Sequence, residues 1–138
     1  SRKHDEYTIV TKCEELILVR MDVQLIIQVL VNLIDNAIKY TPKGSKICIR
    51  GMKCNGKAQI CVEDNGPGIA DEMKPYIFEM FYTGKNTIAD SQRSLGLGLS
   101  LCQSIIEAHD GRLILTDNTP RGCIFTFTLP LSEVTLNE

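Results

Sequence analysis

The stretch from Asp22 to Tyr40 constrains the fold most, because it is apolar around most of a helical circumference. We expect Asp22 to cap this helix at its start and Thr41-Pro42-Lys43-Gly44 to end it. A helix that is apolar over so much of its surface has to be covered by other elements of the protein. We therefore expect most of this helix to be buried against a sheet.

The other segments predict a mixed sheet that helices cover on one face. Strands are expected at Tyr7–Cys13, Leu16–Arg20, Lys46–Met52, Lys57–Asp64, Arg112–Thr116 and Cys123–Leu129, and further helices near Lys74–Phe81 and Gly96–His109. Asn55-Gly56 is a strong hairpin signal between two of these strands. The predicted fold class is therefore α/β (α+β), a two-layer sandwich.

Length, charge and cysteine usage narrow the class of protein. The 138 residues suit one domain, and we expect residues 1–138 to be a single domain cut from a longer protein. A formal charge of −2 gives no broad basic surface for nucleic acid, and no apolar run is long enough to span a bilayer. Six cysteines without a C-x-x-C pair predict reduced thiols in a cytosolic domain rather than disulfides or zinc.

The long helix carries a narrow stripe of amide side chains. Gln28, Asn32 and Asn36 lie one turn apart, with Lys39 on the same side near the helix end. This stripe is either the solvated face of an amphipathic helix or a ligand site. Neutral oxygen ligands at this spacing can reach one hydrated Mg²⁺, and a lysine beside them can neutralise phosphate.

Asp64 ends an alternating strand with the same parity as Val62, so a regular strand points its carboxylate inward. A buried carboxylate needs hydrogen-bond donors, and the glycines at 66 and 68 let backbone approach whatever it binds. An amino group on a flat heterocycle would suit it. The alternative is an ordinary Asp-Asn-Gly turn in which Asp64 caps its own backbone.

A glycine-containing run, Ser94-Leu95-Gly96-Leu97-Gly98-Leu99, leads into the last predicted helix. Free N–H groups and the positive end of a helix dipole suit a phosphate. The alternative is a flexible joint or a helix-packing contact. A dinucleotide-binding motif is excluded, because no strand directly precedes the run and a third glycine is absent. The polar residues Tyr82 to Ser94 before it predict a long loop.

Four segments, taken in order, resemble the nucleotide-binding boxes of sensor histidine kinases. The run from Gln28 to Thr41 resembles the N box, and Asp64 to Ile69 resembles the G1 box. Ile77 to Tyr82 is similar to the F box, and Leu95 to Leu99 is similar to the G2 box. The resemblance covers nearly the whole chain and is strongest to KdpD-type potassium-responsive sensor kinases. It implies the Bergerat sandwich of a catalytic ATP-binding domain.

The resemblance also implies a role for each matched residue. Asn36 would be the main Mg²⁺ ligand with Asn32 beside it, and Asp64 would accept the adenine amino group. Lys39 and Tyr40 would lie near the phosphates and ribose. The adenine would be surrounded by Gly66, Gly68 and Ile69, and the residues that close on the phosphates would be Gly96, Leu97, Gly98 and Leu99. Tyr82 to Ser94 would be a lid over ATP, with Phe78 and Phe81 at its base or simply in the core.

Two departures from the family pattern bear on function. Ser94 stands where the G2 box commonly has another glycine, which can stiffen the lid's exit or alter phosphate contacts. A phosphoacceptor motif is also missing, because His4-Asp5-Glu6 precedes a strand and lacks a long helical hairpin. The resemblance thus implies an acceptor His on an upstream dimerisation domain, and no general base is assigned within this chain.

The implied whole protein is a homodimeric sensor kinase. Its phosphorylated His would pass the phosphoryl group to an Asp on a response regulator, and this domain would be the cytoplasmic part of a membrane-anchored protein. Two other functions stay open. One is a non-catalytic module that senses nucleotide, for which Ser94 is the support, and the other is an anti-sigma-factor serine kinase of the same fold.

Overall fold

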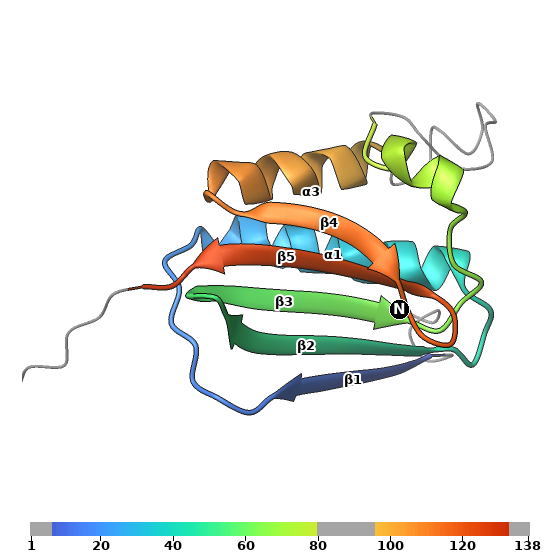
Figure 1. Cartoon of the computed structure of the whole chain (residues 1–138), viewed down its shortest axis with the longest axis horizontal. Coiled ribbons are helices and arrows are strands. Elements are labelled where there is room, and N and C mark those ends of the chain that lie inside the picture. Colours follow the sequence, from blue (N-terminus) through green and yellow to red (C-terminus); the bar gives the residue numbers. More distant parts are fainter. Residues whose placement is uncertain (1–6, 80–95, 133–138) are drawn as a thin grey trace, which may run out of the picture.

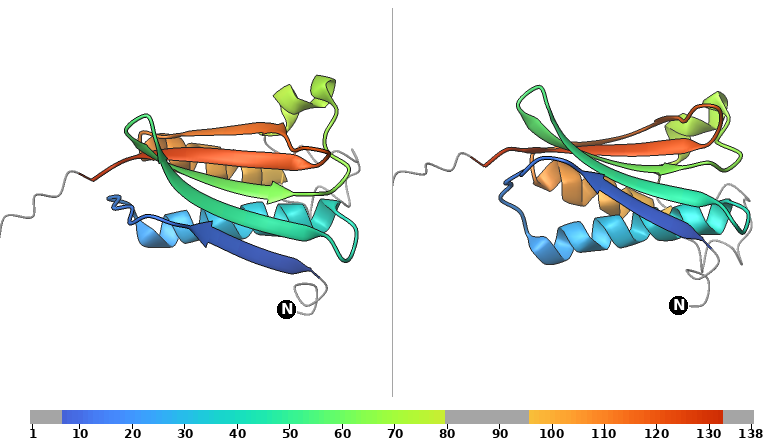
Figure 2. Two further views of the ribbon diagram at one scale, coloured as in Figure 1. Left: turned by 60° about the horizontal axis from the view of Figure 1, so that its bottom comes forward. Right: turned by 90° about the horizontal axis from the view of Figure 1, so that it is seen from below.

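The computed structural model describes residues 7–79 and 96–132, the side chain of Leu97 excepted. Within these residues a five-stranded mixed sheet has the strand order β1-β2-β3-β5-β4. The helices α1 and α3 cover one face of this sheet, as Figures 1 and 2 show, so the predicted two-layer arrangement is confirmed. The elements are β1 (Thr8–Cys13), α1 (Val23–Tyr40), β2 (Lys46–Cys54), β3 (Lys57–Asp64), the 3₁₀ helix η2 (Asp71–Tyr76), α3 (Gly96–Ala108), β4 (Arg112–Asp117) and β5 (Cys123–Pro130).

Strand pairing makes the sheet mixed and sets the position of Asp64. β1 pairs with β2 in parallel, because α1 carries the chain across the sheet between them. The remaining neighbours are antiparallel, and Asn55-Gly56 forms the predicted tight turn between β2 and β3, with φ of 54° and 77°. The β2–β3 register sets Ile47 opposite Asp64, so both share the face that the helices cover.

Helix α1 is fixed at both ends. Asp22 caps it as predicted, since its carboxylate accepts a hydrogen bond from the backbone N–H of Leu25 at 3.1 Å. At the other end the Thr41 hydroxyl donates to the carbonyl of Ala37 at 2.7 Å. The Tyr7 hydroxyl, from the start of the sheet, lies 2.9 Å from the Thr41 carbonyl and 3.0 Å from that of Ile38. These contacts hold the C-terminal turn of α1 against the sheet edge.

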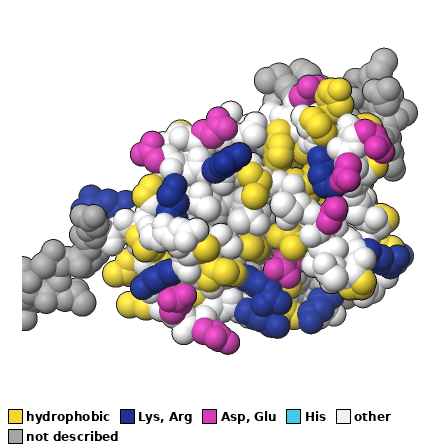
Figure 3. Space-filling view, viewed as in Figure 1, with side chains coloured by type: hydrophobic (Ala, Val, Ile, Leu, Met, Phe, Trp, Pro, Cys, Tyr) yellow, Lys and Arg dark blue, Asp and Glu magenta, His cyan; other side chains and the backbone are white. Residues whose placement is uncertain are grey.

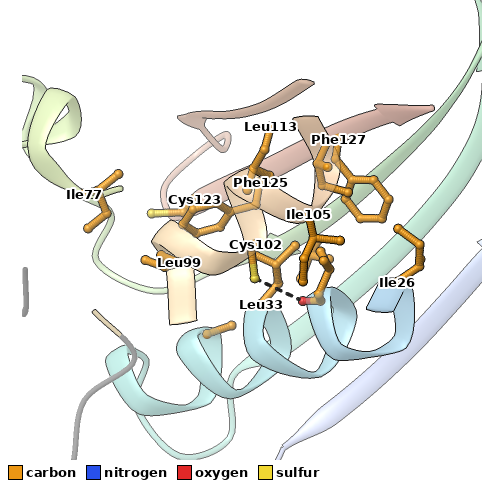
Figure 4. Close-up of a cluster of buried hydrophobic side chains, with 14 of the residues drawn as sticks. Ile26, Leu33, Ile77, Leu99, Cys102, Ile105, Leu113, Cys123, Phe125 and Phe127 are labelled. Carbon is orange, nitrogen blue, oxygen red and sulfur yellow. Dashed lines mark hydrogen bonds between the residues drawn. The ribbon is translucent and has the colours of Figure 1, made fainter. Parts of the chain in front are cut away.

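The core lies between the helices and the sheet (Figure 4). Phe125 and Phe127 of β5 point into it, and each buried side chain of this size contributes about 1.5–3 kcal/mol to stability. The Cys102 thiol of α3 donates to the Val29 carbonyl of α1 at 3.8 Å, which Figure 4 marks where the two helices meet. All six cysteines are free thiols, as predicted.

Two predicted elements are wrong. Residues 16–20 form no strand; they carry the chain from the sheet edge to the start of α1, and Leu16 is 75% exposed. The helix predicted at Lys74–Phe81 is instead the 3₁₀ helix η2, which starts three residues earlier. Pro75 inside η2 has no N–H to donate, which limits it to a short 3₁₀ segment. Phe81 falls outside the described residues.

The expectation that α1 is mostly buried is also wrong. One face, including Val29 and Leu33, is fully buried, but the opposite face exposes Val23, Ile27 and Val31 at 60%, 52% and 47%. The sequence gives no sign of this because both faces are apolar. Among the described residues, no helix is long and apolar enough to cross a bilayer.

Candidate functional site

A cavity of about 270 Å³ opens where α1 ends, between the last residues of β3, the start of β5 and the helix η2. In Figure 1 these segments meet at the right-hand end of the molecule. The residues that line it are Asn36, Tyr40, Thr41, Asp64, Pro67, Gly68, Ile69, Ala70, Met73, Ile77, Cys123 and Phe125. The lining is mostly apolar with a few convergent polar groups, which is typical of a small-molecule site.

Asp64 is the one acidic residue of this lining, and its carboxylate is held firmly. The side chain is buried, as its strand parity predicts. Its Oδ1 accepts hydrogen bonds from the backbone N–H of Gly66 at 2.9 Å and of Cys123 at 3.2 Å. Burial raises the pKa of the carboxyl above 3.8, and the two backbone hydrogen bonds lower it again in part.

The second carboxylate oxygen, Oδ2, is the group that faces the cavity. Oδ2 accepts no hydrogen bond from another described residue, since both bonds to the carboxylate go to Oδ1. In the described parts, every side-chain oxygen that is sealed from solvent has a partner, so Oδ2 is not sealed. Oδ2 is therefore an acceptor that is reached through the cavity. A ligand N–H group that lies flat against the apolar wall would satisfy it.

Close packing around Asp64 explains two of the glycines. A Cβ on Gly66 would lie 2.4 Å from the Thr41 Cγ2 atom, so no side chain fits there. Gly122 has φ +111°, and a Cβ on it would lie 2.0 Å from the Asp64 carbonyl oxygen. In addition, the Asn118 side chain donates from Nδ2 to that carbonyl at 2.8 Å. The turn between β4 and β5 thus packs against the end of β3, outside the cavity.

The last turn of α1 supplies the polar side of the cavity. Asn36 is only 5% exposed, yet no hydrogen bond within the described residues engages its side-chain amide. Among the described residues, every side-chain nitrogen or oxygen that is sealed from solvent has a hydrogen-bond partner. The Asn36 amide is therefore not sealed, and it is open to the cavity that Asn36 lines. Tyr40 lines the same cavity, and the Lys39 ammonium lies 5.4 Å from the centre of the Tyr40 ring.

Asn32 takes a different position from Asn36. It does not line the cavity, and its side chain hydrogen-bonds the Cys102 thiol of α3. Burial raises the pKa of Cys102 to about 11, and this hydrogen bond partly offsets the effect. The structure therefore does not bring Asn32 and Asn36 together on one ligand, and the metal role of Asn32 stays a prediction.

The other predicted site residues divide into three groups. Lining the cavity beside Asp64 are Asn36, Tyr40, Gly68 and Ile69, and Gly66 holds the Asp64 carboxylate. Outside the lining lie Asn32, Lys39, Gly98 and Leu99, the last of which is a core residue. Beyond the described parts fall Phe81, Leu95, the side chain of Leu97 and the predicted lid, Tyr82 to Ser94; α3 begins at Gly96 as predicted.

Several residues of the site were missed by the sequence analysis. Met73 of η2 and Ile77, the residue that follows η2, form one apolar wall, and Cys123 and Phe125 of β5 form a second one. Alternation along β5 indicates that Cys123 and Phe125 share a face. Nothing in the sequence indicates that β5 lies beside β3, which is what brings Cys123 to Asp64.

The donor set suits a hydrated magnesium ion more than a transition metal. The described residues contain no group of three or more His, Cys, Asp or Glu side chains that could hold a metal. The Asn36 amide oxygen is a neutral, hard ligand open to the cavity. Mg²⁺ is commonly bound through one or two protein oxygens, with waters and phosphate oxygens as its other ligands.

A second hollow, of about 450 Å³, is larger but chemically plainer. Its lining is Arg20, His109, Asp110, Pro130, Leu131 and Ser132. Each of its charged side chains is exposed, and it holds no buried carboxylate. The smaller cavity at Asp64 is therefore the better candidate for a specific ligand.

Comparison with known proteins gives the same family from sequence and from structure. Residues 21–133 match the model of the "Histidine kinase-, DNA gyrase B-, and HSP90-like ATPase" family. The sensor protein KdpD of Clostridium acetobutylicum is 43% identical over 117 residues, which is 85% of this chain and 13% of that protein.

Solved structures add two close matches to one kinase. The catalytic domain of histidine kinase ThkA superimposes with a TM-score of 0.76 at 32% identity, covering 93% of this chain and 80% of that one. ThkA in complex with the response regulator protein TrrA matches with a TM-score of 0.75 at 33% identity, covering 95% of this chain and 36% of that one. The chain thus spans about an eighth of the curated KdpD protein and most of the ThkA catalytic domain.

Proposed function

Because the chain belongs to the histidine kinase-, DNA gyrase B- and HSP90-like ATPase family, we propose that it is the ATP-binding catalytic domain of a sensor histidine kinase. The observation that carries this proposal is the Asp64 carboxylate, which offers one free oxygen to an apolar cavity beside Asn36. We propose further that residues 1–138 form a single domain of a longer protein.

Adenine recognition would rest on Asp64. Oδ2 would accept a hydrogen bond from the exocyclic amine, while Oδ1 stays bound to Gly66 and Cys123. The ring would lie between the Met73–Ile77 wall and the Cys123–Phe125 wall. These contacts supply the flat, mostly apolar surroundings that a purine needs.

The phosphates would lie at the end of α1. Asn36 would hold Mg²⁺ through its amide oxygen, and Asn32, which does not line the described cavity, would lie beside it as a further ligand. Bound Mg²⁺ neutralises phosphate charge during phosphoryl transfer. Lys39 and Tyr40 would approach the phosphates and ribose, and the N-terminus of α3 at Gly96, with Leu97, Gly98 and Leu99, would close on them.

The reaction would join two domains. A histidine nitrogen of an upstream dimerisation domain attacks the γ-phosphorus, a nitrogen–phosphorus bond forms, the bond to the bridging β-phosphate oxygen breaks, and ADP leaves. This chain would position ATP and neutralise the charge on its phosphates, and the acceptor domain would supply the nucleophile. From the phosphohistidine the group would pass to a response regulator, and the ThkA–TrrA complex is a relative that assembles with such a protein.

The wider assignments follow from the same reading. The whole protein would be a homodimer anchored in a membrane, with this domain in the cytoplasm and contacting neither nucleic acid nor lipid. The matched relatives are sensor kinases, which favours this function over a serine kinase of the same fold.

A transfer assay tests the proposal. The chain is mixed with Mg²⁺, ATP labelled at the γ-phosphate, and the acceptor domain of the same full-length protein. Label on the acceptor histidine that disappears with Asn36→Ala is the expected result. Tight ATP binding without transfer would instead support the nucleotide-sensing module, and no ATP binding would contradict both.

A further inference from the structure

The ammonium of Lys74 makes three contacts with three different segments. It donates to the carbonyl of Ile69 at 3.1 Å, to the carboxylate of Asp71, and to the carboxylate of Asp117 at 2.9 Å. An ammonium has three N–H donors, so each of them is used. Lys74 therefore ties the loop after β3 and the helix η2 to the end of β4.

The contacts of Lys74 with Ile69 and with Asp117 bear directly on the cavity. Ile69 lines it, and η2 contributes Met73 from the turn that carries Lys74, so the lysine stands behind the cavity wall. Asp71 lies in the same 3₁₀ helix as Lys74, and a contact within one helix cannot fix that helix against the sheet. The Asp117 contact is the one that crosses from η2 to the sheet.

The end of β4 holds the opposite side of the cavity as well. Asn118, the residue after Asp117, donates to the backbone carbonyl of Asp64 at 2.8 Å. Asp117 itself is paired across the sheet with Cys123, whose N–H holds the Asp64 carboxylate. Two consecutive residues thus contact the two sides of the cavity, one through Lys74 and one through Asp64.

We propose that Lys74 and Asp117 are positioning residues that fix the distance between the η2 wall and Asp64, and so set the size of base that the cavity accepts. The inference rests on the proposed nucleotide site. Neither side chain lines the cavity, so both act through Ile69 and Met73. A looser tether would widen the cavity for larger bases before it abolished binding.

The electrostatics of the contact agree with this role. The hydrogen bond with Asp117 is the largest cause that raises the pKa of Lys74, followed by the one with Asp71. The Lys74 side chain is 19% exposed, whereas Asp117 is 63% and Asp71 86% exposed. A pair at this exposure contributes little to global stability, so the effect should fall on the cavity rather than on folding.

Two matched variants separate the cross-link from the charge. Asp117→Asn weakens the contact between η2 and β4, and Asp71→Asn makes the same chemical change within η2. The probes are ADP and N6-benzyl-ADP, which keeps one amine hydrogen for Asp64 and adds a bulky group to that amine. Calorimetric titration gives both affinities, and melting curves check that each variant is folded.

In the parent we expect ADP to bind more tightly than N6-benzyl-ADP. Asp117→Asn should lower ADP affinity by about two- to fivefold and narrow the preference for ADP, because the wall can yield. Asp71→Asn should leave both affinities and their ratio unchanged. An unchanged ratio in Asp117→Asn, or an equal change in both variants, would overturn the inference.

Amide hydrogen exchange without ligand tests the tether separately from the proposed function. Asp117→Asn should speed exchange across residues 69–77 while β3 and β5 keep their protection, and Asp71→Asn should not. Equal exchange in parent and Asp117→Asn would overturn the inference even if the nucleotides bind. If the parent binds no ADP, the proposed function fails, and the exchange result still decides whether the tether holds the wall.

Discussion

Replacing Asp64 by asparagine should turn the acceptor that faces the cavity into a donor. In the parent, Oδ1 accepts two backbone N–H groups, from Gly66 and Cys123. The amide of Asp64→Asn has one oxygen, and only the oxygen can accept those two bonds. The NH₂ group is therefore forced into the position of Oδ2, toward the cavity. The substitution keeps the shape of the side chain and fixes which way its amide lies.

The magnitude follows from the contacts that are lost. A hydrogen bond to a charged group contributes about 1.5–3 kcal/mol, and an unpaired buried donor costs about 1–3 kcal/mol more. The variant loses the hydrogen bond to the charged carboxylate. It also adds an unpaired donor, because the asparagine NH₂ group would face the adenine amine. We expect ATP affinity to fall at least tenfold from the first effect alone, and by about a hundredfold or more if both effects act. Guanine has a carbonyl at the matching ring position, so the preference for ATP over GTP should narrow.

The stability of the ligand-free protein should move the other way. Folding raises the pKa of Asp64 above its ordinary value of 3.8, so its contribution to stability is full below pH 3.8 and is lost as pH rises through the folded pKa. The asparagine variant has no carboxylate to ionise, so it does not lose this stability at neutral pH. At neutral pH it should melt at the same temperature as the parent or higher, and the difference should shrink as the pH falls toward 3.8.

The assay is a calorimetric titration of ATP and GTP against the parent, Asp64→Asn and the control Glu107→Gln. Glu107 is an exposed acid near the far end of α3, so its change to an amide should alter neither affinity. Melting curves at neutral and acidic pH accompany the titrations. An asparagine variant that binds ATP as tightly as the parent would show that Asp64 is only a turn residue.

Three further results are expected. Asn36→Ala should weaken Mg-ATP binding about tenfold while adenosine binding changes little, and Gln24→Ala on the exposed face of α1 should change neither; equal loss for both ligands would contradict a metal role. Gly66→Ala should cost about 1–3 kcal/mol in denaturant unfolding because its Cβ meets Thr41 Cγ2, and Thr41→Ser, which lacks that methyl group, should recover most of it. Iodoacetamide should label exposed Cys13 and Cys54 in the native protein, whereas Cys102 and Cys123, whose pKa values burial raises to about 11 and about 12, should react only on unfolding; fast native labelling of either would refute their burial.

Much of the fold follows from local signals in the sequence. The Asp22 cap, the Asn55-Gly56 turn and the inward parity of Asp64 each depend on a few neighbouring residues, and the structure has all three. The site residues that these signals place, Asn36 and Asp64, do line one cavity. Local chemistry was sufficient for these two side chains, but not for Asn32 and Lys39, which lie on the same helix as Asn36 and outside the lining.

The misses share a cause in tertiary packing. The apolar run at 16–20 has strand-like composition but crosses to α1, and the exposed face of α1 is as apolar as its buried face. Asn118, Lys74 and Cys123 reach the site because β4, η2 and β5 meet at the end of β3. No spacing within the sequence indicates that meeting point. Basic and acidic side chains are interspersed on the face in Figure 3, and this mixture gives no sign of the site either.

The central claim, that the cavity at Asp64 binds ATP, is tested most directly by mapping backbone amide shifts in the nuclear magnetic resonance spectrum as ATP and Mg²⁺ are added to the labelled chain. The account predicts the largest shifts at Gly66, Gly68 and Cys123, with little change near His109 and Leu131 at the larger hollow. Shifts that gather around His109 and Leu131, or no shifts at millimolar ATP, would contradict it.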